Sequence, residues 1–223
     1  MTTKLFLQAI TKFFLGLVLI ALLLFVPAGT IHYWNGWLLI AILFIPMFIA
    51  GIIMMIVNPE LLKKRLNAEE TEPEQKTVIA LSGIMFLAAF IVAGLNFRFK
   101  WIVMPNWSVI LSTVIFLLAY LMYAEVLREN AYLSRTIEVQ NNQVVIDTGL
   151  YGVVRHPMYT ATVVLFTSMG LVLGSPLSFL ILLCYIPIIV KRIRNEETVL
   201  EKGLKGYKEY KTKVKYRLVP FIW

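Results

Sequence analysis

FFLGLVLIALLLFVPAGTIHYWNGWLLIAILFIPMFIAGIIMMIVNP, residues 13–59, contains no Asp, Glu, Lys or Arg. An apolar helix of about 20 residues crosses a bilayer once, so this stretch is long enough to cross twice. The turn PAGTIHYWNG divides it, and Trp34 and Trp37 stand where an aromatic belt would mark the membrane surface. The stretch therefore predicts a pair of membrane helices.

The rest of the chain continues this pattern. Its 223 residues are 59% hydrophobic and only 15% charged, which is too apolar for a soluble domain. We therefore expect an all-α integral membrane protein with about six transmembrane segments. The last two, residues 157–190, are separated only by Gly174-Ser175-Pro176 and should form a short, tight hairpin. The four later apolar segments run over about 78–97, 107–127, 158–173 and 177–190.

The charges predict an orientation. If six segments are counted with both termini in the cytoplasm, 19 of the 21 Lys and Arg residues lie on the cytoplasmic side. Only Arg98 and Lys100 fall on the other side, as the positive-inside rule expects. The net charge of +8 then reflects topology and anionic lipid headgroups, not nucleic acid.

GLYGVVRHPMY, residues 149–159, is the stretch that concentrates chemistry. Pro157 suits the first turn of a helix, so His156 should stand at or just before a helix N-terminus. Free N–H groups at that position favour an anionic ligand group, and Arg155 adds a full positive charge. The alternative is that the Arg-His pair only marks the cytoplasmic boundary of a membrane helix.

The segments on either side of the hairpin should complete this site. TIEVQNNQVVIDTG, residues 136–149, alternates polar and apolar residues around Asn141-Asn142 and predicts a short β-like excursion. In the tail, the returning hairpin would bring Glu196 or Glu197 back toward His156; the alternative is a solvated helix end with local ion pairs. Further along, one apolar face predicts an interfacial amphipathic helix that roofs a pocket; it comprises Tyr207, Tyr210 and Val214.

The order of these motifs resembles the membrane-embedded isoprenylcysteine carboxyl methyltransferase family and its phospholipid methyltransferase relatives. The motifs are G-x-Y-x-x-x-R-H-P-x-Y, a short helical hairpin, E-E-x-x-L and Y-x-x-Y. The resemblance covers about residues 128–223, and the first four segments match only in kind. Leu150 departs from the pattern, because many members have proline before the tyrosine.

The resemblance implies an S-adenosylmethionine-dependent methyltransferase with a cytoplasmic cofactor pocket and a lipophilic acceptor that arrives from the bilayer. It divides the chain into four N-terminal helices with a loop at 58–77 (1–127) and a catalytic region (128–223). That region comprises a loop (128–156), the hairpin (157–190) and a tail (191–223). The residues implied at the cofactor are Tyr151, His156, Tyr159, Glu196, Glu197, Asn130 and the backbone around Val144. The residues implied in catalysis are Arg155, which would orient a carboxylate of the acceptor or donor, and Glu197.

Several alternatives stay open. A carboxylate acceptor needs no general base, whereas the ammonium of a phospholipid amine must first lose a proton, which Glu197 or His156 would accept. The R-H-P-x-Y core alone also resembles NADPH-dependent sterol-type membrane reductases, and a non-catalytic membrane scaffold is a third reading. Metal catalysis is not expected, because the two histidines and one cysteine lack metal-ligand spacing.

Overall fold

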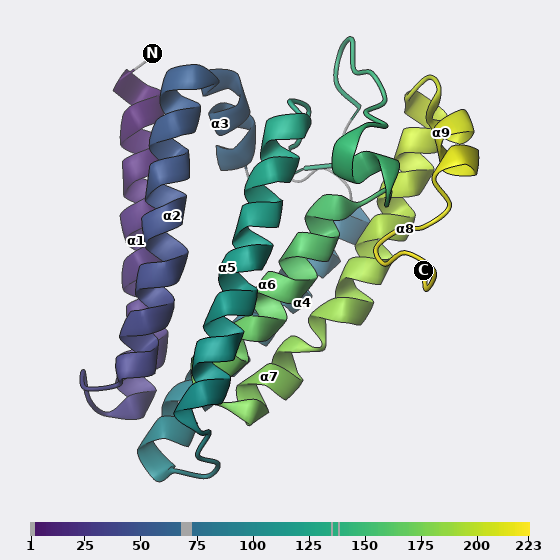
Figure 1. Ribbon diagram of the computed structural model, residues 1–223. Helices are drawn as coiled ribbons and strands as arrows, with labels where there is room; N and C mark the ends of the chain where they lie inside the picture. The colour runs from purple at the N-terminus through teal and green to yellow at the C-terminus, as the bar shows by residue number, and fades with distance from the viewer. Residues whose placement is uncertain (1–2, 68–72, 135, 138) are drawn as a thin grey trace.

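The computed structural model describes residues 3–67, 73–134, 136–137 and 139–223 (Figure 1). Every regular element in this part of the chain is helical, which confirms the predicted all-α class. The elements are α1 Thr3–Ala28, α2 Trp34–Val57, α3 Pro59–Leu66, α4 Pro73–Phe99, α5 Asn106–Glu129, the 3₁₀ turn η1 Gly149–Gly152, α6 Pro157–Val172, α7 Pro176–Leu182, α8 Tyr185–Gly203 and α9 Tyr207–Lys213.

Within the described residues, five segments are long and apolar enough to cross a membrane. They are Leu5–Ala28, Trp34–Val57, Gln75–Phe99, Asn106–Glu129 and Pro176–Gly203. The sixth expected segment corresponds to α6, an apolar helix of 16 residues. Figure 1 shows these helices running roughly side by side, with α1 and α2 forming one edge of the bundle.

The predicted tight hairpin is present, but its two arms differ in length and continuity. Gly174, at φ +69°, ends its first arm, and Ser175 caps α7 by accepting a hydrogen bond from the N–H of Ser178 at 3.2 Å. The arms lie so close together at Gly170 that a β-carbon there would overlap the backbone of Phe179. The second arm breaks after Leu182 and continues as α8 well beyond the expected end of the hairpin at residue 190.

Side chains tie the loops together at one end of the bundle. The Tyr33 hydroxyl donates to the carbonyl of Leu173 at 2.5 Å, and Asn35 donates to that of Val172 at 2.9 Å. Asn96 donates to the carbonyl of Gly174 at 3.3 Å. These bonds satisfy carbonyl groups that the end of α6 leaves without helical partners. The turn of the hairpin is thereby fixed against α2 and α4.

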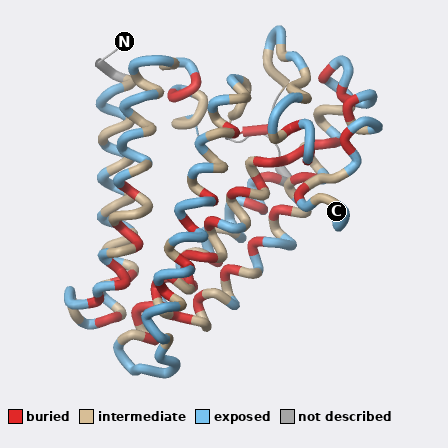
Figure 2. Tube along the Cα trace, viewed as in Figure 1, coloured by how far each residue is buried: buried red, intermediate tan, exposed pale blue. Residues whose placement is uncertain are grey.

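The core runs along the interior of the bundle (Figure 2). Buried side chains of α1, α4, α5, α6 and α8 form one cluster, which includes Leu24, Ala89, Phe116, Leu165 and Ile189. The outward faces of α1, α2 and α5 carry many exposed apolar side chains. In a membrane protein these faces contact lipid, so their exposure needs no other partner.

The other end of the bundle carries the polar segments. Asn58 caps α3 by accepting from the N–H of Leu61, and Lys64 donates to the Gln140 side chain at 2.6 Å. Arg65 hydrogen-bonds to the Tyr123 hydroxyl on α5. α3 therefore fastens the first polar loop to the second. Residues 68–72 of the expected loop at 58–77 lie outside the described residues.

The β-like excursion is wrong in the described part of 136–149, where no strand forms. A strand needs a partner for its backbone groups. Here Gln140 and Gln143 instead close a turn on each other, with Asn142 at φ +59° as its predicted turn residue. The apolar side chains of this segment do not form one face of a sheet, because Val139 and Val145 pack against the tail.

Candidate functional site

A short 3₁₀ turn places Tyr151 at the start of the site. Gly149 adopts φ +53°, and a β-carbon there would overlap the carboxylate of Glu129 on α5. The same carboxylate accepts the N–H of Leu150 at 3.1 Å. Proline has no N–H to donate, so this departure from the family pattern provides a hydrogen bond that proline would lack. The turn is thereby fixed to α5, and Tyr151 is buried.

His156 caps α6 and Pro157 opens it, as the sequence predicts. The N–H groups of Arg155 and His156 are not free, however. They donate to the carbonyls of Tyr216 and Arg217 in the tail, each at 2.9 Å. The tail therefore occupies the place that the sequence suggested for an anionic ligand group.

Glu197 is the centre of a buried ionic cluster. Its Oε1 accepts from Arg155 Nε at 2.8 Å and lies 3.3 Å from His156 Nε2, and its Oε2 accepts from Arg217 Nε at 2.9 Å. The side chains of Arg155 and Glu197 are each 4% exposed. Arg155 Nη1 also donates to the carbonyls of Val214 and Lys215 at 2.8 Å each. The α8 helix thus returns toward His156 as expected, but Arg155 binds the protein's own carboxylate and backbone.

Glu196 has a different environment from its neighbour. Its Oε2 accepts the Tyr159 hydroxyl at 2.5 Å, and its Oε1 lies 4.0 Å from His156 Nδ1. The Tyr159 hydroxyl also accepts from Arg192 Nε at 2.9 Å, and Arg192 Nη1 donates to Gln75 of α4 at 3.1 Å. Glu196 lines the pocket described next, whereas Glu197 lies behind it.

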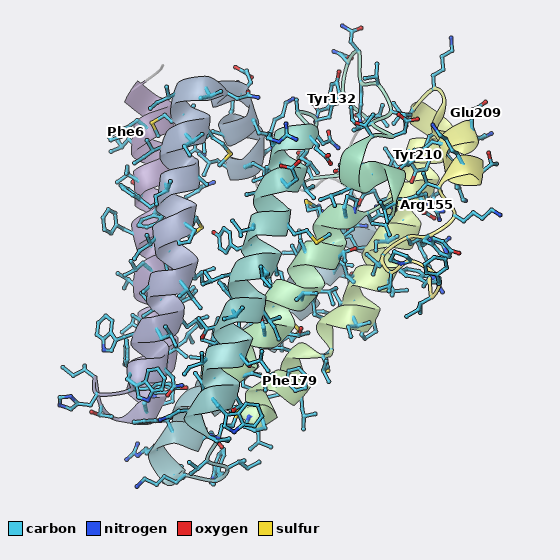
Figure 3. The ribbon with its side chains drawn as sticks, in the orientation of Figure 1. Phe6, Tyr132, Arg155, Phe179, Glu209 and Tyr210 are labelled. Carbon is cyan, nitrogen blue, oxygen red and sulfur yellow. The ribbon has the colours of Figure 1, made fainter. Side chains whose placement is uncertain are left out.

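A pocket lies between the hairpin, the second polar loop and the tail. Its cavity volume is about 100 Å³, measured as the space open to the centre of a water molecule, and the empty space around it, open solvent included, is about 830 Å³. Figure 3 shows side chains of the loop around Tyr132 and of the tail around Tyr210 near Arg155. Seven of the eight sequence-predicted site residues line it: Asn130, Val144, Tyr151, Arg155, His156, Tyr159 and Glu196. Asn130 contributes to the pocket wall by donating a hydrogen bond to the Tyr151 hydroxyl at 3.0 Å.

Residues at the beginning of the tail line part of this pocket. Tyr207, Tyr210 and Val214 are buried together with Leu204, and both tyrosines line the pocket. The Tyr210 hydroxyl donates to the carbonyl of Tyr151 at 2.8 Å. The Tyr207 hydroxyl is buried, and no group in the described part of the chain forms a hydrogen bond with it. An unpaired buried hydroxyl is costly, and a bound polar group would remove that cost.

Burial alters the acidity of the tyrosines in this region. It raises the pKa of Tyr151, Tyr207 and Tyr210 well above the usual value near 10. Nearby carboxylates, Glu196 among them, act in the same direction on Tyr151 and Tyr207. All three side chains therefore stay neutral at physiological pH and offer hydroxyl groups, not phenolates.

The sequence missed part of the lining. Tyr132, Ser134 and Thr136 belong to a loop without regular structure, and no local pattern shows which of its side chains point inward. Arg192 of α8 was missed as well, and it donates to Tyr159 of α6 and Gln75 of α4. The remaining apolar pocket residues not named from the sequence are Leu133, Ile137, Val145, Ile146, Met158, Leu200 and Leu204. Their apolar character alone could equally indicate lipid contact.

Among the described residues, no group of three or more His, Cys, Asp and Glu side chains could hold a metal ion. The carboxylates of the site are instead engaged by arginine, histidine and tyrosine.

A comparison with protein families finds a match to part of the chain. Residues 109–202 match the model of the isoprenylcysteine carboxyl methyltransferase (ICMT) family. The matched segment begins in α5 and ends in α8, so it contains the focal stretch, the hairpin and both glutamates. No curated protein matches the chain.

Proposed function

Because residues 109–202 match the model of the ICMT family, a family of membrane methyltransferases, we propose a specific reaction for this chain. It transfers a methyl group from S-adenosylmethionine to a lipophilic acceptor, such as an isoprenylcysteine-like carboxylate. The pocket residues, the hairpin and the tail of 128–223 carry the reaction, and the helices of 1–127 supply the membrane scaffold.

The aromatic lining of the pocket is the observation that carries the proposal. The rings of Tyr132, Tyr151, Tyr159, Tyr207 and Tyr210 surround it. Aromatic faces attract compact organic cations, and a sulfonium is such a cation. Glu196 adds a carboxylate for a positively charged or hydroxyl-bearing part of the ligand, and the unpaired Tyr207 hydroxyl offers a further polar contact.

The charges of the pocket favour this ligand over a nicotinamide dinucleotide phosphate. The phosphates of such a cofactor require cationic groups that are free to bind them. Arg155 is held by Glu197 and two carbonyls, and Arg192 is engaged by Tyr159 and Gln75.

S-adenosylmethionine, when bound, supplies a methyl group activated by its sulfonium sulfur. Displacement at that carbon depends on alignment and on exclusion of water. Tyr207 and Tyr210 of the tail line the pocket and reduce its exposure to water. The Glu197 cluster holds His156 and Arg155 in fixed orientations. We therefore assign Arg155 and Glu197 positioning roles. A carboxylate acceptor needs no base, whereas an ammonium acceptor would have to pass a proton to Glu196 or His156.

Calorimetric titration of the full chain in lipid nanodiscs tests the cofactor. S-adenosylhomocysteine should bind, NADPH should not, and His156→Ala and Glu196→Gln should each weaken binding at least several-fold. Binding of NADPH alone would replace the proposal with a reductase. Binding of neither ligand to protein that melts cooperatively would favour a scaffold.

A second experiment identifies the acceptor class. The protein is incubated with methyl-labelled S-adenosylmethionine and a lipid extract, and the labelled lipid is treated with base. A methyl ester releases labelled methanol, whereas an N-methyl group retains the label. We expect release; retention would assign a phospholipid amine acceptor instead.

A further inference from the structure

The last eight residues, YRLVPFIW (216–223), have an unusual surface for a polar tail. We call this segment the C-terminal hook. Phe221 is 87% exposed, Ile222 79% and Val219 42%. Burying one such side chain is worth about 1.5–3 kcal/mol, so three adjacent ones left in water are costly. The preceding residues of α9 do the opposite and bury their apolar side chains against the pocket.

The backbone of the hook satisfies most of its own hydrogen bonds. The carbonyl of Trp223 accepts the N–H groups of Arg217, Leu218 and Val219 at 2.8, 3.0 and 3.2 Å. The carbonyl of Val219 accepts those of Ile222 and Trp223 at 3.2 Å each, and Pro220 has no N–H to satisfy. A segment can enter an apolar medium only when its backbone groups are paired in this way.

The hook lies against the membrane helices, apart from the tail cluster. Leu218 belongs to the same buried cluster as Ile189 and Ile193 of α8, and Trp223 packs against that cluster. Figure 1 shows the end of the chain beside α8, displaced from α9 toward the middle of the bundle. The hook is thus anchored on the membrane helices through Leu218 and Trp223, while Phe221 and Ile222 stay exposed.

The flanking residues fit a position at the membrane surface. The Tyr216 ring packs on the Phe221 ring with centroids 5.3 Å apart, and Arg217 lies over the Trp223 ring at 5.0 Å. Lys215, just before the hook, is exposed. Aromatic rings with basic residues on their polar side are typical of the interface between hydrocarbon and headgroups.

We propose that the C-terminal hook inserts Val219, Phe221 and Ile222 into the bilayer interface on the pocket side of the protein. Insertion stabilises the tail segment that contacts the site. In this segment the Arg217 side chain pairs with Glu197, and the Arg217 carbonyl accepts the His156 N–H. The Leu218 carbonyl accepts the Thr160 hydroxyl at 2.8 Å. The membrane thereby supports the arrangement of the site. This inference does not depend on the methyltransferase assignment.

Spin labels measure the depth of the hook directly. In a Cys184→Ala background, single cysteines replace Phe221, the exposed α9 residue Lys208, or the lipid-facing Val114 of α5. Each labelled protein is placed in nanodiscs of phosphatidylcholine and phosphatidylglycerol, one molecule per disc. Collisions with oxygen and with a water-soluble nickel chelate are then measured.

We expect the oxygen-to-nickel ratio of the Phe221 label to exceed that of the Lys208 label several-fold and to approach that of the Val114 label. A ratio equal to that of the Lys208 label would overturn insertion. A label shielded from both reagents would also overturn it, because the patch would then be covered by protein. Ile222→Cys, labelled in the same way, repeats the measurement should Phe221→Cys fold poorly.

Discussion

At the scale of single residues, two neighbouring tyrosines of α9 separate binding from stability. The Tyr207 hydroxyl is buried and unpaired, whereas the Tyr210 hydroxyl bonds to the carbonyl of Tyr151. We predict that Tyr207→Phe leaves the melting temperature of the ligand-free protein unchanged or higher, yet weakens S-adenosylhomocysteine binding about fivefold or more. Tyr210→Phe should instead lower stability by about 1 kcal/mol. Melting curves and titrations of both variants provide the comparison. Equal effects of the two changes on binding and stability would contradict it.

The two adjacent glutamates, Glu196 and Glu197, should also differ in whether they contribute mainly to ligand binding or to stability. Glu197 is buried between two arginines and a histidine, so Glu197→Gln leaves the charges of Arg155 and Arg217 without their carboxylate partner. We expect it to lower the free energy of unfolding by about 3 kcal/mol or more. Glu196→Gln removes a pocket carboxylate that only partly contributes to packing, so it should reduce ligand affinity with a much smaller loss of stability. Denaturation in detergent measures both; a larger loss from Glu196→Gln would refute the assigned roles.

The buried tyrosines also predict an alkaline transition. Their pKa values are raised in the folded protein, so they bind protons that the unfolded chain releases above its pKa near 10. Their stabilising effect is complete below pH 10 and is lost as the pH rises further. Melting temperatures should therefore fall above pH 10, and Tyr207→Phe should make that fall shallower. A fall of the same slope in both proteins would show that other groups, such as lysines, dominate.

Much of the site could be predicted at this scale, because its residues are concentrated in two short motifs. Pro157 fixed the helix start, and the hairpin length returned Glu196 and Glu197 to His156. Which glutamate faces the pocket could not be predicted, since it depends on the rotation of α8. The partner of Arg155 was also missed, because the loop carbonyls of Val214 and Lys215 leave no pattern in the sequence.

At the scale of elements, the helical hairpin depends on a glycine contact. Gly170 of α6 leaves no room for a β-carbon against the Phe179 backbone, whereas Gly83 of α4 has no atom within 4 Å of that position. Gly170→Ala should destabilise the protein by about 1–3 kcal/mol by forcing the arms apart. Gly83→Ala, the matched control, should be neutral or stabilise by up to about 1 kcal/mol. Thermal melting in the same detergent compares them. A neutral Gly170→Ala would mean that the arms are not packed as closely as described.

The helices were predicted correctly and the β-like excursion wrongly, and each outcome has a physical reason. The length of an apolar run identifies membrane helices well, because the thickness of the hydrocarbon core sets the minimum number of residues in a helix that crosses it. The excursion at 136–149 was wrong because alternation alone does not provide a partner strand. The break between α7 and α8 was also missed, as residues 177–190 read as one continuous apolar run.

At the scale of the whole molecule, the two ends of the bundle differ in charge. Arg98 and Lys100 lie at the end that carries the hairpin turn, where Asn96 bonds to Gly174. The pocket, α3 and α9 lie at the opposite end with nearly all the other described charges (Figure 1). The positive-inside rule then assigns the pocket end to the cytoplasm.

Thiol labelling tests this topology. In a Cys184→Ala background, cysteine replaces either Lys100 at one end or Lys205 at the other, both exposed. A membrane-impermeant maleimide should label the Lys100→Cys protein from outside intact cells, because the positive-inside rule predicts that this loop faces outward. The Lys205→Cys protein should react only in inside-out vesicles. Labelling of both positions from one side would mean that an even number of segments crosses the membrane between them, and α6, the shortest apolar helix, would be the first to reassign. The reverse pattern would place the pocket outside, where S-adenosylmethionine made in the cytoplasm could not reach it, and the proposed function would fail with the topology.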